Sequence, residues 1–139
     1  MKKFLSVFLC LIMVFSLVAC GGNANETTEP AFTPVSDGAV VGEGSVSFPL
    51  TIVDKEGNSI TITVNTDAET VGAALVELGL VEGEDSEYGL YVKTVNGITA
   101  DYNVDATYWA FYINDEYAMT GVDQTPIVSG ETYSLKVEG

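Results

Sequence analysis

The sequence predicts an α+β domain in which a mostly antiparallel sheet is covered on one face by a single helix. Three observations predict this class. Short segments with the apolar–polar alternation of β-strands recur between residues 46 and 137. One amphipathic helical segment, residues 66–78, interrupts them. Gly, Asn and Asp residues stand between the segments, where turns are needed.

The first regular elements are predicted to form a β-hairpin. Residues 46–52 and residues 60–64 each alternate apolar and polar side chains. The turn between them, residues 54–58, contains Gly57, which takes a positive φ at no steric cost. Pro49 has no backbone N–H, so we expect its strand to be an edge strand or to be paired on one side only at this position.

The one predicted helix follows this hairpin. Thr66 and Glu69 match the capping-box pattern, which predicts Thr66 as the N-cap. Gly79 is the predicted C-cap. Gly72 weakens the helix, and it favours close packing on the sheet. An apolar stripe recurs with helical spacing and consists of Val71, Ala74, Leu75 and Leu78.

The remaining elements are predicted to be mainly strands. Residues 80–89 form an acidic connection. Asn96-Gly97, a strong hairpin signal, joins two strands, residues 90–95 and residues 98–102. A turn is predicted at residues 114–116, followed by a short segment around Ala118 and Met119 and by a loop with Gly121 and Pro126. In the last predicted strand, the apolar residues Tyr133, Leu135 and Val137 alternate with polar ones. This order of elements favours a β-grasp-like arrangement, with the first hairpin and the last strand in one sheet.

An aromatic strand, residues 107–114, is the centre of the predicted sheet and includes the single Trp of the chain. Alternation places Trp109, Phe111 and Ile113 on one apolar face, which we expect in the core. Tyr108, Ala110 and Tyr112 lie on the other face, where phenol hydroxyls need water or hydrogen-bond partners. Such a strand is either the middle of a sheet or the floor of a binding surface.

Residues 1–19 have the features of a bacterial lipoprotein signal peptide. A short basic start precedes an apolar run, residues 4–18, that is too short to predict a membrane span. The run ends in the lipobox-like sequence LVACG, so Cys20 is predicted to be acylated and to become the new N-terminus. Cys10 would leave with the signal peptide, so the mature chain has no disulfide.

The predicted mature chain begins with a lipid-anchored tether, residues 20–44, which is rich in Gly, Thr, Glu, Asn and Pro and is expected to lack regular structure. The folded domain is predicted to comprise residues 45–139. We expect an extracytoplasmic protein that is attached to the bacterial cell membrane through its N-terminal lipid and is a monomer.

The charge of the chain excludes nucleic acid as a partner. Past residue 19 there are three lysines and 20 acidic residues, a side-chain charge of −17. This charge repels nucleic acid and anionic lipid head groups, so membrane attachment must come from the lipid. We expect no enzyme, because the sequence has no His, the mature chain has no Arg, and its one Cys is predicted to be acylated.

No metal site is assigned from the sequence. Residues 101–105 begin like a calcium loop, but Ala106 and Tyr112 stand where that loop requires Gly and Glu. A calcium site of another kind remains open there or in the acidic connection, and the alternative is that both segments are solvated loops. The acidic residues of the connection are Glu82, Glu84, Asp85 and Glu87.

The tyrosines of the second half of the chain are the better functional candidates. Tyr rings bind flat ligands with polar edges as well as protein strands, although most strand tyrosines simply pack in a core. The residues that we predict to form a ligand-binding surface are Tyr88, Tyr108, Tyr112, Tyr117 and Met119.

Several short motifs together resemble a known family, the bacterial lipoprotein domains of transcobalamin-like C-terminal type (DUF4430-type). The matching segments are Thr70-Val71 and Ala74-Leu75, Gly89-Leu90-Tyr91-Val92, Val95-Asn96-Gly97, residues 108–114, Gly121-Val122 and residues 130–133. Asn114-Asp115 stands where the family often has Asn-Gly. The resemblance implies a β-grasp-like fold that in vitamin carriers is the smaller half of a cobalamin-binding clamp. The larger helical half has no counterpart in this sequence, and no His is present to ligate cobalt.

Two functions are therefore compatible with the sequence. The first is a lipoprotein that binds a small molecule, with cobalamin or a related cofactor as a possible ligand and no cofactor required, as an accessory of uptake. The second is a protein-interaction or surface-display module that recognises another surface protein through a sheet edge.

Overall fold

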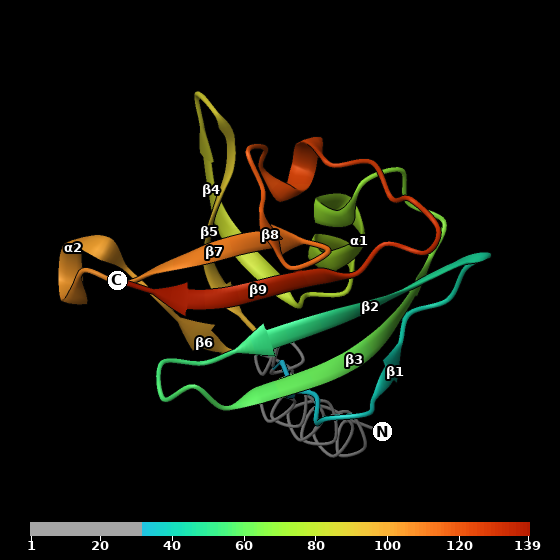
Figure 1. Cartoon of the computed structure of the whole chain (residues 1–139), viewed down its shortest axis with the longest axis horizontal. Helices are drawn as coiled ribbons and strands as arrows, with labels where there is room; N and C mark the ends of the chain where they lie inside the picture. The colour runs from blue at the N-terminus through green and yellow to red at the C-terminus, as the bar shows by residue number, and fades with distance from the viewer. Residues whose placement is uncertain (1–31) are drawn as a thin grey trace, which may run out of the picture. The chain divides into compact units, whose positions relative to one another are not determined.

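The computed structural model describes residues 32–139, which form two β-sheets, two α-helices and one 3-10 helix (Figure 1). The predicted signal peptide, the lipidation at Cys20 and the first part of the tether lie outside the described residues. Within the described part, no helix has the length and apolar character needed to cross a membrane. The elements are β1 (Val40–Val41), β2 (Val46–Val53), β3 (Ser59–Thr66), α1 (Val71–Glu77), β4 (Val81–Ser86), β5 (Gly89–Val95), β6 (Ile98–Thr99), α2 (Tyr102–Asp105), β7 (Tyr108–Ile113), β8 (Glu116–Tyr117), η1 (Val122–Gln124) and β9 (Tyr133–Glu138).

The larger sheet has the strand order β1-β3-β2-β9-β7-β8. The first hairpin and the last strand share this sheet, as predicted, and β9 runs parallel to β2 and antiparallel to β7. The pairing of β1 with β3 is also parallel, and the other pairings are antiparallel. The partners that β2 takes in β9 begin at Leu50, so Pro49 is paired on the β3 side only, as its missing N–H requires.

The sequence prediction of a single sheet under a single helix was wrong. Three further strands form a second sheet with the order β4-β5-β6. The predicted acidic connection is largely β4, which pairs with β5 from Val81 to Ser86 and exposes its acidic side chains along a free edge. An edge strand needs no alternating apolar face on its outer side, and charged residues on it discourage pairing with other chains. Because the sequence of β4 is polar and lacks apolar–polar alternation, the pattern did not predict this strand.

The core lies on one face of the larger sheet and has Tyr133 near its centre. The Tyr133 side chain is fully buried, meets Phe48 edge-on at 5.2 Å and stacks on Phe111 at 6.1 Å between ring centroids. Its hydroxyl accepts a hydrogen bond from the Val128 N–H and donates one to Glu131, so burial of this phenol leaves no unpaired polar atom.

The aromatic strand β7 is largely oriented as predicted. Trp109 and Phe111 are 7% and 8% exposed and belong to the core, and Ile113 is half-buried against it. Ala110 is also buried, so the opposite face of β7 is not uniformly wet. Tyr108 and Tyr112 on that opposite face are half-buried.

Helix α1 is shorter than predicted because its N-terminus lies one turn later. Thr66 remains in β3, opposite Val46, and its hydroxyl accepts a hydrogen bond from the Ala68 N–H. Glu69 accepts a backbone hydrogen bond from Ile127, which holds the chain extended before the helix. The true N-cap is Thr70, whose hydroxyl accepts from the Ala73 N–H at 3.2 Å.

The buried face of α1 agrees with the sequence pattern, but the C-cap lies one residue before the predicted Gly79. Val71, Ala74 and Leu75 are buried, and Leu78 is the C-cap. Gly79 follows with φ +71°, so it supplies the left-handed residue that ends the helix. Gly72 does not face the sheet as expected, because a Cβ there would lie 2.6 Å from backbone atoms of Asp123 in η1.

A Thr70→Ala substitution is expected to lower the free energy of unfolding by about 1 kcal/mol, because it leaves an N-terminal N–H of α1 without its side-chain acceptor. Urea unfolding followed by circular dichroism measures the change. Thr70→Ser keeps the hydroxyl and should restore most of the stability. Equal losses in both variants would contradict a capping role.

The second predicted strand after the Asn96-Gly97 turn is also interrupted. Only Ile98–Thr99 pairs with β5, and the chain then forms α2 instead of continuing to Tyr102 as a strand. The Asp101 side chain caps α2 by accepting from the Asn103 N–H, and Ala106 ends it with φ +59°. The segment after the Asn114-Asp115 turn is strand β8, Glu116–Tyr117, rather than a segment around Ala118 and Met119.

The end of the predicted tether is ordered against the domain. Val40 and Val41 form β1, and Asp37 accepts a hydrogen bond from the Thr61 N–H. Asn96, which is buried at its turn with φ +50°, exchanges two hydrogen bonds with the backbone of Val35. The folded part therefore begins before residue 45, because these backbone groups find partners in the domain.

Candidate functional site

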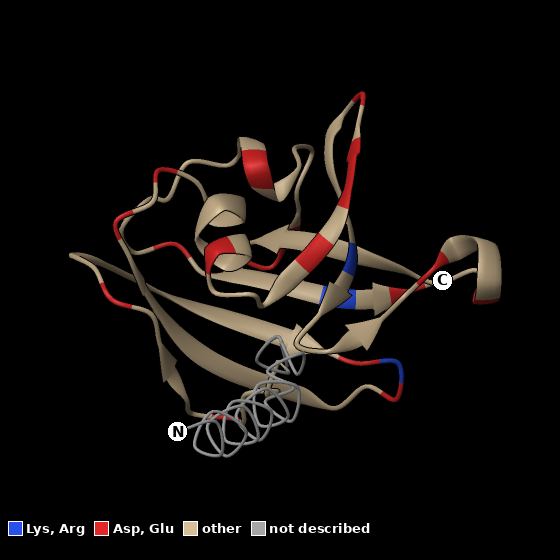
Figure 2. Cartoon of the chain, turned by 180° about the vertical axis from the view of Figure 1, so that it is seen from behind, with Lys and Arg blue, Asp and Glu red and all other residues tan. Residues whose placement is uncertain are grey.

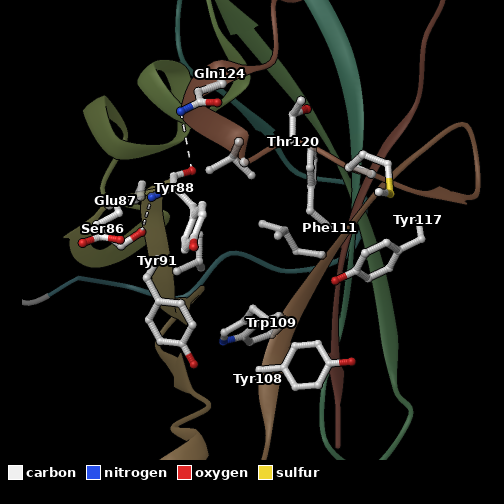
Figure 3. A pocket seen from close by; sticks show the side chains of 17 residues that line it. Ser86, Glu87, Tyr88, Tyr91, Tyr108, Trp109, Phe111, Tyr117, Thr120 and Gln124 are labelled. Atoms are coloured by element: carbon white, nitrogen blue, oxygen red, sulfur yellow. Dashed lines mark hydrogen bonds between the residues drawn. The ribbon is translucent and has the colours of Figure 1, made fainter.

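An aromatic cleft of about 600 Å³ lies between the β4–β5 hairpin and the edge of the larger sheet formed by β7 and β8 (Figure 3). It brings together segments that are far apart in the sequence. Its lining consists of Ser86, Glu87, Tyr88, Leu90, Tyr91, Val92, Tyr108, Trp109, Phe111, Tyr117, Ala118, Met119, Thr120, Gly121, Val122, Gln124 and Leu135.

Trp109 fixes the cleft floor by joining the two sheets. Its indole N–H donates to the carbonyl oxygens of Lys93 in β5, at 3.1 Å, and Ile98 in β6, at 3.2 Å. Leu135 and Phe111 continue the floor from β9 and β7. Because the indole is held by packing and by hydrogen bonds, this part of the cleft is preorganised.

The hairpin tip forms the first wall of the cleft. The Ser86 hydroxyl donates to the Gly89 carbonyl and accepts from the Tyr88 N–H, which closes the turn, and Gly89 has φ +102°. Tyr88 is 84% exposed at this tip, and Tyr91 lies further along the same wall. The Gln124 amide reaches across to the Tyr88 carbonyl at 3.5 Å (Figure 3).

The second wall depends on the turn between β7 and β8. Asn114 and Asp115 both have positive φ, 51° and 64°, which is the backbone of a two-residue hairpin turn. The turn returns the chain antiparallel to β7 and places the Tyr117 ring edge-on to Tyr112, at 5.7 Å between centroids. Met119, which follows β8, is 93% exposed at the rim.

The structure brings together four of the five residues predicted to bind a ligand. Tyr88, Tyr108, Tyr117 and Met119 line the cleft, and Tyr112 does not. Their role in binding remains a prediction. The sequence did not single out the other lining residues, because their pattern placed them in strands or loops. They include Tyr91, Trp109, Phe111, Thr120 and Gln124.

Tyr112 is directed to a polar cluster outside the cleft lining. Its hydroxyl donates to Glu138, which also accepts from Tyr108 at 3.3 Å, and the Lys136 ammonium lies 4.4 Å from the Tyr112 ring centroid. The hydrogen bond to Glu138, together with desolvation and the negative charge, raises the pKa of Tyr112 to about 12. Burial and Glu138 raise the pKa of Tyr108 as well.

These tyrosines predict a pH dependence at the alkaline end. A raised pKa means that the folded protein favours the neutral phenol, so the contribution of Tyr112 to stability is complete below pH 10 and is lost as the pH rises toward 12. Ultraviolet titration of tyrosinate should show a late-ionising group that Tyr112→Phe removes. Glu138→Gln should move this ionisation to lower pH, and an unchanged titration would contradict the assignment.

The described carboxylates do not form a metal site. Among residues 32–139, no group of three or more Asp, Glu, His or Cys side chains could hold a metal ion. Asp101 caps α2, and Asp105 contacts Lys55 and Thr107. The Lys55 ammonium, followed by the Thr107 hydroxyl, lowers the pKa of Asp105 to about 2. The segment with the partial calcium-loop pattern is thus built into a helical turn.

Comparison with known proteins gives one family and similar solved structures. The model of a domain of unknown function, DUF4430, matches residues 68–138. A crystal structure of a candidate metal-binding protein from Ruminococcus gnavus ATCC 29149 is 30% identical, with a TM-score of 0.64, and the match covers 68% of this chain and 97% of that protein. No curated protein matches the chain.

The fold also resembles part of haptocorrin, solved in complex with Cbi. The sequences are 19% identical, the TM-score is 0.50, and the match covers 70% of this chain and 26% of haptocorrin. This chain therefore spans about a quarter of haptocorrin, and the likeness concerns the fold alone.

Proposed function

This chain belongs to the DUF4430 family, and from that premise we propose that its aromatic cleft binds a small-molecule ligand. The observation that carries the proposal is the cleft itself. It combines a fixed Trp109 floor with exposed aromatic and Met side chains, at Tyr88, Tyr117 and Met119, on opposite walls. Exposed apolar groups that gather around a concave surface mark binding sites more often than scattered ones do.

Cobalamin or a related corrinoid is the first ligand to test. The support is the likeness of the fold to haptocorrin, whose structure contains Cbi. In this proposal the cleft contacts one side of the ligand, and the remaining side is free for a second protein. The arrangement proposed for the domain is β-grasp-like, with α1 against the larger sheet.

The metal-binding description of the Ruminococcus gnavus protein is not carried over. The described residues of this chain offer no set of three ligands, and the charged side chain that lines the cleft, Glu87, is a single carboxylate. We propose a binding protein rather than an enzyme. We also propose that Cys20 carries a lipid and holds the domain outside the cytoplasm as an accessory of uptake.

Titration of the full chain with cyanocobalamin tests the proposal. The chain has one Trp, so intrinsic Trp fluorescence reports on the cleft floor alone, and ligand absorbance gives an independent signal. Replacing both Tyr88 and Tyr117 by Ala should weaken binding about tenfold or more, since aromatic side chains that a ligand covers are typical binding hot spots.

Tyr102→Ala is the matched control for this experiment. Tyr102 is 61% exposed on α2 and does not line the cleft, so its loss should leave the affinity unchanged. A flat response in both signals up to high micromolar ligand would refute corrinoid binding by this chain alone.

The second candidate function is recognition of another surface protein. The observation that favours it is the edge of β4, which pairs with β5 on one side and leaves its other side open in the described part of the chain. A partner strand could extend this sheet through backbone hydrogen bonds. Loss of partner capture on replacing Glu84 by Pro, with unchanged small-molecule binding, would favour this function.

A further inference from the structure

We propose that the aromatic cleft selects small organic cations, of the quaternary ammonium type, over neutral and anionic molecules of the same shape. This inference rests on the proposed small-molecule site and not on a corrinoid as its ligand, since cyanocobalamin carries no net charge.

The surface of the cleft is rich in aromatic side chains. Six of its lining residues are aromatic: Tyr88, Tyr91, Tyr108, Trp109, Phe111 and Tyr117. Figure 3 shows Tyr88 and Tyr91 on the hairpin side, Phe111 and Tyr117 on the other side, and Trp109 between them. Aromatic faces carry partial negative charge and attract alkylated ammonium groups, which keep few hydrogen bonds to water and so are cheap to desolvate.

The charge in the lining of the cleft is negative. Glu87 is the single charged residue of the lining, and it is negative. The lysines of the described chain are engaged elsewhere: Lys55 pairs with Asp105, Lys93 with Glu84 at 3.2 Å, and Lys136 lies over Tyr112. The β4–β5 hairpin, which forms the first wall of the cleft, carries further exposed acidic residues on β4 (Figure 2). An anion would meet no positive partner in this cleft.

A buried carboxylate oxygen of Asp123 lies next to the cleft lining. The Oδ1 atom of Asp123 is buried and has no hydrogen-bond partner among residues 32–139. It lies close to two glycines, since a Cβ on Gly89 would be 2.7 Å from it and a Cβ on Gly121, which lines the cleft, would be 2.9 Å from it. Asp123 does not itself line the cleft, but its carboxylate adds a negative charge next to the lining residue Gly121, which favours a cation over an anion there.

The same sheet already holds a cation over a tyrosine ring. The Lys136 ammonium lies 4.4 Å from the Tyr112 centroid, inside the range of cation–π attraction. Tyr112 is edge-on to Tyr117, which lines the cleft. The contact shows that a phenol ring on β7, the strand that pairs with β8, accommodates a positive charge.

Three probes of the same shape test the inference: choline, dimethylbutanol, in which carbon replaces the quaternary nitrogen, and dimethylbutanoate, which is anionic. Their affinities for the full chain are measured by nuclear magnetic resonance at physiological ionic strength, which screens the diffuse charge of the protein. Choline should bind about tenfold more tightly than dimethylbutanol, and dimethylbutanoate should bind most weakly.

Variants locate the selectivity. Glu87→Gln and Asp123→Asn should each reduce the ratio of choline to dimethylbutanol affinity. Glu56→Gln removes the same charge from the exposed β2–β3 turn, outside the cleft lining, and should leave the ratio unchanged. A Tyr88→Leu variant, at an exposed position that does not endanger folding, should weaken choline more than dimethylbutanol.

The outcomes separate this inference from the proposed function. Equal binding of choline and dimethylbutanol would overturn the selection of cations while leaving a small-molecule site. If Tyr88→Leu leaves the choline affinity unchanged, the cation binds to the diffuse acidic surface, and the inference is overturned too. If neither the probes nor cyanocobalamin bind, both the inference and the small-molecule site fall.

Discussion

Replacing Trp109 by Ala is expected to lower the free energy of unfolding by about 3–5 kcal/mol. The indole is 7% exposed, packs in the core and supplies the N–H that bonds to carbonyls of both β5 and β6. Its loss removes apolar contacts and also a link between the two sheets. Urea unfolding followed by circular dichroism measures the change, since the variant has no Trp fluorescence.

Trp109→Phe separates packing from hydrogen bonding. The ring remains and the donor is lost, so we expect a smaller cost of about 1–2 kcal/mol. Amide hydrogen exchange should quicken in β5 and β6 more than in β2 and β3, because the loosened contact belongs to the smaller sheet. A Phe variant as stable as the natural protein would show that the indole N–H does not join the sheets.

Gly72→Ala is expected to destabilise the protein by about 2 kcal/mol, although Ala is the better helix former by about 1 kcal/mol. The added Cβ would lie 2.6 Å from the Asp123 Cα and N atoms and 2.8 Å from the Val122 carbonyl carbon. These are backbone atoms, so η1 must move as a whole. Overpacking of this kind outweighs the gain in helix propensity.

Ala73→Gly measures how much the difference in helix propensity between Ala and Gly contributes to stability in α1. Ala73 is the next residue of α1 and is exposed, so its replacement should cost about 1 kcal/mol through the backbone alone. Urea unfolding of both variants gives the comparison. A Gly72→Ala protein more stable than the natural chain would mean that η1 yields without cost.

Local sequence patterns predicted the hairpins correctly. They failed where contacts with distant segments determine the bounds of an element. The alternation in residues 46–52 and the Asn96-Gly97 turn are local signals, and the structure confirms both elements. The sequence pattern predicted Thr66 as the N-cap, whereas the structure has Thr70. The contact of Glu69 with Ile127 favours Thr70, and no pattern within the helix reveals it. The capping-box prediction therefore missed by one turn.

The candidate site shows the same division. Tyr88, Tyr117 and Met119 could be singled out as exposed aromatic or apolar residues beside turns. That they face one cleft depends on the position of the β4–β5 hairpin, which the sequence did not predict because β4 appeared as a polar connection. Tyr112 alternates with Trp109 and Phe111 on β7, and its Glu138 partner on β9 takes it out of the predicted surface.

The position of β9 has a consequence for how the polypeptide reaches its native state. β9 inserts between β2 and β7, yet it follows both of them in the chain. Until β9 is synthesised and pairs with them, β2 and β7 each have an edge without a partner strand. The pairing of Leu50 with Tyr133 must also close a long loop. Assembly of the larger sheet should consequently be slow and late, and the nascent chain depends on protection from aggregation during that interval.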